Sequence, residues 1–487
     1  MLSTSCLVTG GLPRWAISSA VGRGLVQRSS TQLFLEPTPL ADVSTRQGIA
    51  MGSDPATSPQ WASVVLVGLS ALAIAISYAD RSNLSTAIIP MAKELNWNSL
   101  FSGLVLSAFW AGYATTQVLG GALADAYGGE LLLVLAMLLW SCATALTPLA
   151  AAAGTVQVLG ARVLLGVGEG LALPSVHSML RRYVPKGRRS VAASVVTSAC
   201  FLGALLSNYI APIVIEKFDW QTCFYGFALI PSLIWLPLWG AFLFYKGAAG
   251  KEKVSPVSTG VDVMAQKEED EEDSATVMQL LKSPPVWAII SAQYGQSWGM
   301  IGLLSWLPTY YSQRFNVPIA SLAEFTVLPY FLQLGVSLLA GGIADNLIAK
   351  GVRILSVRKT LQTLGMVAPA VCLAYCSYAT GLSAVQAASF ITLGSALSAL
   401  TVGAVSCNHF DISSKKNAGT IFGIGNTASC IGGLVGVPIS GFVYDQTHSW
   451  SLVFGLFAFH YLGGAYFYNL WADDKPIVFA SEEEKKD

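Results

Sequence analysis

The segment VQVLGARVLLGVGEGLALPSVHSML, residues 156–180, decides the fold class of this chain. It is almost wholly apolar and long enough to cross a bilayer, which takes roughly 20 helical residues. Two charged residues, Arg162 and Glu169, interrupt it. A charge at bilayer depth costs at least about 2.5–3.5 kcal/mol, so it is retained where it faces a polar interior. The segment therefore predicts a membrane helix with a polar face.

The spacing of the polar residues favours a column on that face. Arg162 and Glu169 are seven positions apart, nearly two helical turns, and His177 follows eight positions later. The first two side chains then stack, and the histidine falls within about a quarter turn of them. A cation, an acid and an imidazole in one column are typical of a solute path. The alternative is an internal ion pair that only holds helices together.

The rest of the chain has the composition of an all-α membrane protein. Of 487 residues, 53% are hydrophobic and 11% are charged, whereas soluble domains carry about 25% charged residues. The eight cysteines show no zinc, redox or disulfide spacing. No catalytic triad, phosphate-cradling glycine loop or nucleic-acid-binding motif occurs. We expect no enzyme activity, no metal site and no organic cofactor.

Twelve apolar segments predict twelve spans in two groups of six. They are approximately 61–82, 99–121, 131–152, 156–179, 190–214, 221–245, 285–310, 322–344, 358–379, 383–407, 418–442 and 450–471. This divides the chain into a six-helix bundle at 59–245, a charged linker at 246–283, a second six-helix bundle at 284–472 and a charged tail at 473–487. GGALADAYGG (120–129) and GGIADNLIAKG (341–351) echo each other after the second span of each half, which indicates a parallel repeat.

The flanking charges predict location and orientation. Residues 1–58 are rich in Ser and Thr, carry four arginines and have their first acid at Glu36. This composition predicts an organellar transit peptide, chloroplast ahead of mitochondrion, with a disordered cytosolic tail as the alternative. Basic residues cluster in the loops after spans four, eight and ten. By the positive-inside rule, both termini face the cytosol, or the stroma in a plastid.

Five stretches of the chain resemble one family. They are SYADRSNLSTAIIP (77–90), FWAGYATTQVLGGALAD (109–125), the 156–180 segment with RRYVPKGRRSVA (181–192), SWGMIGLLSWLPTYY (297–311) and SCNHFDISSKKNAGTIFGIGNTAS (406–429). In this order they are similar to the anion:cation symporters of the major facilitator superfamily, over roughly residues 62–472. That family includes vesicular glutamate transporters, sialin, sodium–phosphate cotransporters and plastid phosphate transporters. The resemblance implies two six-helix bundles around a central cavity.

The resemblance also implies roles for the charged residues. Arginines at the positions of Arg81 and Arg162 line the cavity and meet the anion, and a guanidinium suits carboxylate or phosphate oxygens. The alternative for Arg81 is a pair with Asp80 or an escape to the surface. Glu169 is the expected cation-coupling group, with a permanent pair to Arg162 as the alternative. His177 either titrates near neutral pH as a second coupling group or is a plain hydrogen-bonded histidine.

Further residues complete the predicted site. Tyr78, Tyr294 and Asn426 are polar groups expected to line the path. Gln296 stands where vesicular glutamate transporters carry an arginine, and Leu106 where they carry a histidine, which favours a small inorganic anion or a monoanionic organic acid. Asp125, Asp345 and Arg188 are predicted gating residues. The family's basic residues in the loop after Asp125 are replaced here by Ala126 and Glu130.

We therefore expect a monomeric secondary transporter of inorganic phosphate or a related small anion, driven by sodium or protons. The alternatives are an organic-anion transporter for a carboxylate, ascorbate or an acidic amino acid, and a membrane receptor that has lost transport.

Overall fold

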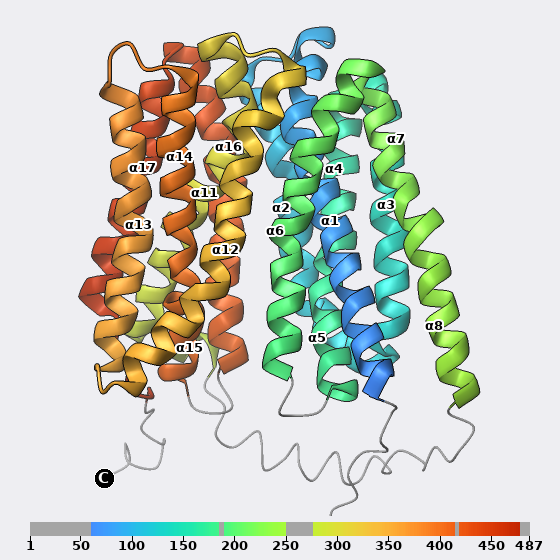
Figure 1. Cartoon of the computed structure of the whole chain (residues 1–487), viewed down its shortest axis with the longest axis vertical. Coiled ribbons are helices and arrows are strands. Elements are labelled where there is room, and N and C mark those ends of the chain that lie inside the picture. The colour runs from blue at the N-terminus through green and yellow to red at the C-terminus, as the bar shows by residue number, and fades with distance from the viewer. Residues whose placement is uncertain (1–59, 185–188, 250–275, 414–417, 478–487) are drawn as a thin grey trace, which may run out of the picture. The chain divides into compact units, whose positions relative to one another are not determined.

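The computed structural model of the protein describes residues 60–184, 189–249, 276–413 and 418–477. Throughout these ranges, the regular elements are helices (Figure 1). The predicted transit peptide at 1–58, most of the predicted linker and Arg188 lie outside the described residues, as does the side chain of Asp125.

The helices before the linker form the N-terminal half of the described chain. They are α1 (Gln60–Glu94), α2 (Ser99–Tyr127), α3 (Gly129–Ala153), α4 (Thr155–Gly170), α5 (Ala172–Tyr183), α6 (Arg189–Lys217), α7 (Trp220–Ile230), the π-helical turn η2 (Pro231–Trp235) and α8 (Leu236–Ala249).

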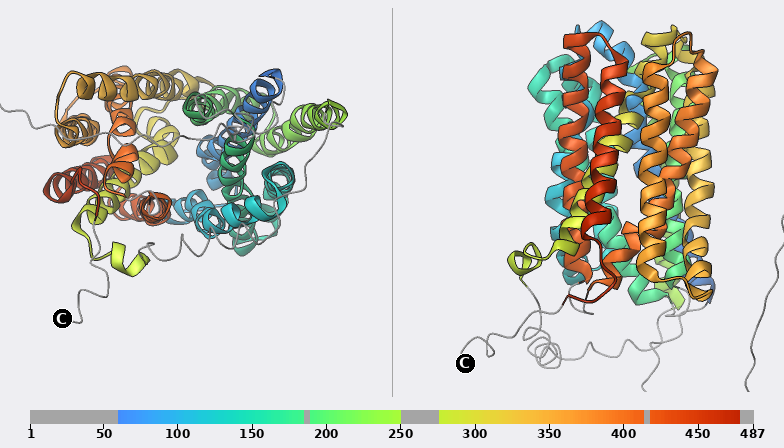
Figure 2. Two further views of the ribbon diagram at one scale, coloured as in Figure 1. Left: turned by 90° about the horizontal axis from the view of Figure 1, so that it is seen from below. Right: turned by 90° about the vertical axis from the view of Figure 1, so that its left-hand side faces the viewer.

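The helices from Val277 onward form the C-terminal half, and the first of them lies within the predicted linker. They are α10 (Val277–Leu280), α11 (Pro284–Phe315), the 3₁₀ turn η3 (Ile319–Ser321), α12 (Leu322–Ala349), α13 (Ile354–Tyr378), α14 (Ala384–Ser398), the 3₁₀ turn η4 (Ala399–Gly403), α15 (Val405–Asp411), α16 (Ala418–Thr447) and α17 (Trp450–Trp471). Figure 2, left, shows the two halves side by side, blue to green and yellow to red.

Ten helical stretches of the described chain are long and apolar enough to cross a membrane, so this is a multi-pass membrane protein. They coincide with ten of the twelve predicted spans. The other two predicted spans form α2 and α11, helices of 29 and 32 residues that are not among the ten. Predicted ends were less accurate: the first span was expected to stop at residue 82, whereas α1 continues to Glu94.

The fourth predicted span of each half is a broken helix. α4 ends at Gly170 and α5 begins at Ala172. Pro174 explains the break, because a proline has no N–H to donate to the carbonyl four residues earlier, which here belongs to Gly170. In the second half, α14 passes through η4 before α15 begins. Membrane helices tolerate such breaks where neighbouring protein surrounds them.

Backbone contacts fix α2 against α4. A Cβ atom on Gly112 would lie 2.0 Å from the carbonyl oxygen of Val163, and one on Gly166 would lie 2.0 Å from that of Phe109. Only glycine fits either position, and this is the usual way for membrane helices to approach closely. α2 also packs on α16 and α6 on α12, so the two halves meet along both pairs.

One carboxylate connects the halves at the end where α2 begins. Asp445, near the end of α16, accepts hydrogen bonds from the backbone N–H groups of Ser99 (2.9 Å) and Leu100 (2.7 Å). Asn98 caps the same helix by accepting from the N–H of Phe101 at 2.8 Å. The first amides of a helix have no partner within it and carry partial positive charge, so an anionic acceptor stabilises them.

Candidate functional site

A cavity of about 240 Å³ lies between the two halves. Helices α1, α2, α4 and α6 line it from the N-terminal half, and α11, α12 and α16 from the C-terminal half. Its polar lining from the first half comprises Tyr78, Arg81, Ser82, Ser85, Trp110, Tyr113, Arg162 and Cys200; from the second half it comprises Ser297, Ser305, Tyr330, Gln333, Asn426 and Ser429. The described lining thus contains two cations, both from the N-terminal half.

Arg81 is held by an acid and by aromatic rings. Its Nη2 and Nε donate to Oε2 of Glu169 at 2.7 and 3.1 Å. Its guanidinium carbon lies 4.4 Å from the ring centre of Tyr78 and 4.2 Å from that of Phe109, within the range of cation–π attraction. Because α1 continues to Glu94, Arg81 lies near the middle of the helix and does not escape to the surface.

Arg162 has a different environment. It lines the cavity, is 1% exposed, and its Nε and Nη1 have no hydrogen-bond partner. Arg81 binds Oε2 of Glu169, and the Oε1 atom of that carboxylate has no hydrogen-bond partner. The alternative of a permanent hydrogen-bonded pair between Arg162 and Glu169 is therefore not seen in this structure. A buried donor without a partner carries a desolvation penalty. Arg162 therefore places two hydrogen-bond donors without acceptors at the wall of the cavity.

Sequence reasoning missed a second buried acid, Asp80. It does not bond to Arg81. Its Oδ2 accepts from the hydroxyl of Thr144 at 2.7 Å, and its Oδ1 accepts from Asn83 at 3.4 Å. The side chain is 1% exposed. The signal was present, because an acid inside an apolar span is costly wherever it occurs. Asp80 and Glu169 together balance the formal charge of the two arginines.

The remaining predicted lining residues divide into two groups. Tyr78 and Asn426 line the cavity, and Asn426 also bridges the halves by donating to Oε1 of Gln117 at 3.1 Å. Gln296 and Tyr294 are not part of the lining. Gln296 donates to the hydroxyl of Thr401 at 2.6 Å, and the ring of Tyr294 packs near that of Trp298, with centroids 5.7 Å apart.

The predicted column is only partly formed. Arg162 and Glu169 are both buried on α4, but His177 is exposed on α5 and does not line the cavity. Eight residues of helical rise place it roughly 12 Å beyond Glu169, and it lies on α5, past the break that follows Gly170. The structure therefore does not bring His177 together with the two charged residues.

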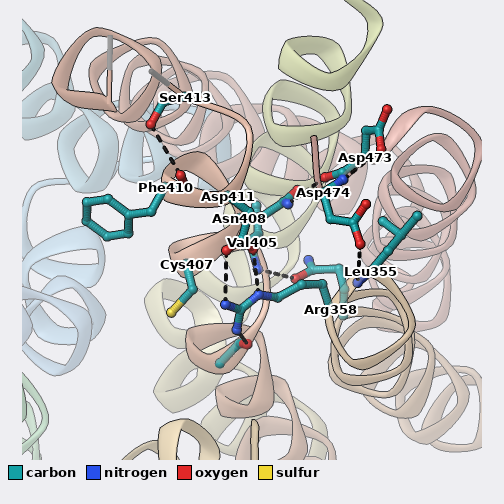
Figure 3. Close-up of polar contacts among 12 residues, drawn as sticks. Leu355, Arg358, Val405, Cys407, Asn408, Phe410, Asp411, Ser413, Asp473 and Asp474 are labelled. Atoms are coloured by element: carbon teal, nitrogen blue, oxygen red, sulfur yellow. Dashed lines mark hydrogen bonds and ion pairs between the residues drawn. The ribbon is translucent and has the colours of Figure 1, made fainter. Parts of the chain in front are cut away.

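The predicted gating residues are also not assembled in the described chain. Asp345 is exposed in the last turns of α12, while Arg188 and the side chain of Asp125 lie outside the described residues. A buried ion pair is found at the end of the C-terminal half instead (Figure 3). Arg358 donates to Asp411 at 2.8 Å and to the carbonyl of Gly403 at 2.8 Å.

The start of the predicted charged tail joins this network. The backbone N–H of Leu355 donates to Asp474 at 3.1 Å, and Asn408 donates to the carbonyl of Asp473 at 2.9 Å (Figure 3). Residue 477 also donates through its backbone to the carbonyl of Ile412 at 2.9 Å. The ends of α13, α15 and α17 are thus held together. Sequence reasoning counted Arg358 only among the basic loop residues and did not predict this pairing.

Buried arginines at a cavity between two helical halves are typical of membrane transporters. Residues 70–437 match the profile of the Major Facilitator Superfamily. The chain belongs to that superfamily and, with its closely similar relatives, to the anion:cation symporter family. This confirms the predicted family and the expectation of a transporter in place of an enzyme.

Three similar plant proteins show what the chain resembles. The chain is 35% identical to a probable anion transporter 6, chloroplastic, of Arabidopsis thaliana, over 87% of this chain and 83% of the relative. It is 33% identical to the ascorbate transporter, chloroplastic, of the same plant (90% and 81%). It is also 33% identical to that plant's sodium-dependent phosphate transport protein 1, chloroplastic (85% and 80%).

Solved structures agree on the fold. A D-xylose–proton symporter superposes with a TM-score of 0.67 at 16% identity, over 85% of this chain and 99% of that one. A bacterial homologue of the human lysosomal transporter Spinster, inward-facing and occupied, gives a TM-score of 0.66 at 15% identity, over 85% and 97%. At such identities the likeness concerns the fold alone.

Proposed function

We propose that this protein is a secondary active transporter that moves inorganic phosphate or a related small anion together with sodium or protons. The observation that carries the proposal is Arg162: a cation 1% exposed at the cavity wall, with two nitrogens that have no partner in the protein. An anion with several oxygens would satisfy both donors, and guanidinium–oxyanion hydrogen bonds are among the strong ones.

We propose that transport occurs by alternating access, in which the cavity between the two halves opens to one side of the membrane at a time. We propose that α2 and α11 also cross the membrane, giving twelve spans in two six-helix bundles. Both helices exceed the roughly 20 residues that a crossing needs. The start of α1 and the end of α17 lie at the same end of the molecule (Figure 1), as an even number of crossings demands. The basic loops support the proposal that this end faces the cytosol or the stroma.

Glu169 is the proposed coupling group. In this structure its carboxylate neutralises Arg81 at 2.7 Å. A proton on Glu169, or a sodium ion beside it, would weaken that pair and release the guanidinium toward the anion. Cation and anion binding are then linked through one shared arginine, and the linkage is reciprocal.

An organic anion is the second proposed substrate, because two observations favour it. One relative is named an ascorbate transporter. The cavity also has aromatic and apolar walls, including Phe109, Trp110, Phe201 and Leu304, which suit a carbon skeleton better than a hydrated inorganic ion. Small-ligand sites are commonly apolar with a few placed polar groups.

The relatives' names also support a location. All three are called chloroplastic, and residues 1–58 have the composition of a transit peptide. We propose that the protein lies in a plastid membrane. We also propose that it acts as a monomer.

Uptake into liposomes tests the proposal. The full chain would be reconstituted and supplied with labelled phosphate or labelled ascorbate, under a sodium gradient and separately under a proton gradient. Uptake that requires one gradient identifies both the anion and the coupling ion, with protein-free liposomes as the control. If neither anion enters under either gradient while the protein remains folded, the proposal is wrong.

A further inference from the structure

Gln333 is a buried amide on the cavity wall opposite the arginines. It lies on α12 in the C-terminal half, is 1% exposed and lines the cavity. Its Oε1 is buried without a hydrogen-bond partner. The cavity therefore has an unsatisfied donor group on one wall, Arg162, and an unsatisfied acceptor on the other.

The hydrogen bonds around Ser398 fix which way this amide points. The hydroxyl of Ser398 donates its single proton to the carbonyl of Ser395 at 2.7 Å. Its oxygen can then only accept, so the Gln333 group facing it at 3.4 Å must be the NH₂ group. An exchange of the amide O and N, which is the usual uncertainty for a glutamine, would set two acceptors against each other. Oε1 consequently points away from Ser398.

Ser398 is itself held from the other side. Gln296 donates to the hydroxyl of Thr401 at 2.6 Å, and Thr401 donates to the carbonyl of Ser398 at 2.8 Å. Gln296 was predicted from the sequence to adjust specificity at the cavity. It instead positions Gln333 through a series of hydrogen bonds that runs by way of Thr401 and Ser398. Gln333, whose amide lines the cavity, is the last residue of this hydrogen-bonded series.

We propose that Oε1 of Gln333 accepts a hydrogen bond from an O–H group of the bound anion. The inference rests on the proposed transport function and narrows its substrate class. A suitable anion offers charged oxygens to Arg162 and also carries a hydroxyl donor. Phosphate at neutral pH retains at least one proton, and a hydroxylated organic anion such as ascorbate meets the same requirement. Sulfate is similar in shape but has no proton to donate, so the buried acceptor would stay unpaired and sulfate is rejected.

The test compares anions and variants in the full-length protein reconstituted in liposomes. Uptake of labelled phosphate, compared with that of labelled ascorbate, shows which anion is transported and so which one donates the hydroxyl hydrogen bond. Unlabelled sulfate is then added as a competitor. Gln333→Met removes the acceptor with little change of volume. We expect the KM of the transported anion to rise roughly three- to tenfold with the maximal rate retained, and sulfate to compete poorly in the unmodified protein. Gln313→Met, at an exposed glutamine of α11, is the matched control and should leave KM unchanged.

Two results would overturn the inference and leave anion transport intact. One is competition by sulfate as effective as that by unlabelled phosphate in the unmodified protein, a comparison that depends on no variant folding. The other is an unchanged KM in a folded Gln333→Met protein. Absence of all anion uptake in the unmodified protein is a different result, because it removes the proposed function itself.

Discussion

The two walls of the cavity achieve polarity by different means. The N-terminal wall contains charged residues: Arg81 paired with Glu169, and Arg162 near the pair. The described C-terminal wall contains amides and hydroxyls, among them Gln333, Asn426 and Ser429. Positive charges attract any anion of suitable size. Neutral donors and acceptors instead distinguish an anion that has an O–H group to donate from one that has none. The comparison indicates that affinity comes mainly from one half and selectivity from the other.

The same contrast applies to the two buried ion pairs. Arg81–Glu169 lies at the cavity, where a ligand can compete for it. Arg358–Asp411 lies at the end of the C-terminal half, and Arg358 also holds the carbonyl of Gly403. We therefore expect the first pair to affect transport and the second to affect stability alone. Four changes test these contrasts between the regions of the molecule, two of them at the ion pairs themselves.

Replacing Arg162 should have the largest effect on transport. Arg162→Ala removes the unpaired cation of the cavity, and losing one partner of a desolvated charged contact typically costs about 2–5 kcal/mol. We expect uptake of the transported anion to fall by about 10²-fold or more. Arg314→Ala, at an exposed arginine of α11, is the control. A folded Arg162→Ala protein with uptake within twofold of normal would contradict the assignment of affinity to this wall.

Neutralising Glu169 should be costly to stability. Glu169→Gln leaves Arg81 buried without its counter-charge, which destabilises by about 3–5 kcal/mol, and thermal unfolding in detergent measures the loss. The double variant Arg81→Gln with Glu169→Gln removes both charges and should recover part of it. Any remaining uptake by Glu169→Gln should no longer respond to the gradient. A Glu169→Gln protein that is as stable as the original and still concentrates anion shows that the pair is neither structural nor coupling.

The second ion pair should behave differently. Asp411→Asn weakens the contact with Arg358 and should lower stability by about 1.5–3 kcal/mol, because both side chains are largely buried, with exposures of 9% and 15%. The KM for anion should not change. A large rise in KM at unchanged stability would mean that the C-terminal end of the molecule takes part in binding, and the contrast between the two pairs would fail.

The smallest expected effect concerns the contact between the halves at the start of α2. Asp445→Ala removes the acceptor for the amides of Ser99 and Leu100, and losing a helix cap costs about 1 kcal/mol. This end should then open more often. A cysteine introduced at Ser102, which is 3% exposed, should react faster with a membrane-impermeant maleimide when Asp445 is replaced. Equal labelling rates with and without Asp445 would show that the carboxylate does not hold this end closed.

The sequence was sufficient to predict the burial of Arg162 and Glu169, but it did not predict how they pair. The burial of Asp80 and Arg358 was missed. Arg162 and Glu169 stand in an apolar run, so their burial follows from the cost of exposing charge to lipid. The partner of Glu169 is Arg81, 88 positions away in the chain, and no local spacing predicts that contact. His177 belongs to the same apolar run, yet it lies on α5, beyond the break after Gly170, and does not line the cavity.

Neutral polar groups were harder to find. Gln333 is a single glutamine in an apolar helix, and the cost of burying an amide is small beside that of a charge. Its importance depends on the hydroxyl orientation of Ser398, 65 positions later, which only a three-dimensional structure supplies. For the same reason Gln296 was expected at the cavity although Thr401 holds it away from the wall.

The glycine contact between α2 and α4 has a mechanical consequence. Gly112 touches the carbonyl of Val163, the neighbour of Arg162, with no side chain between the two backbones. From there α2 runs as a stiff rod of roughly 20 Å to Ser99, where Asp445 holds it. We therefore expect a displacement of α4 at Arg162 to move α2 as well, including its first turn at Ser99. A bulkier residue at position 112 would push α2 away from α4 and so weaken the mechanical link between the binding site and the closed end.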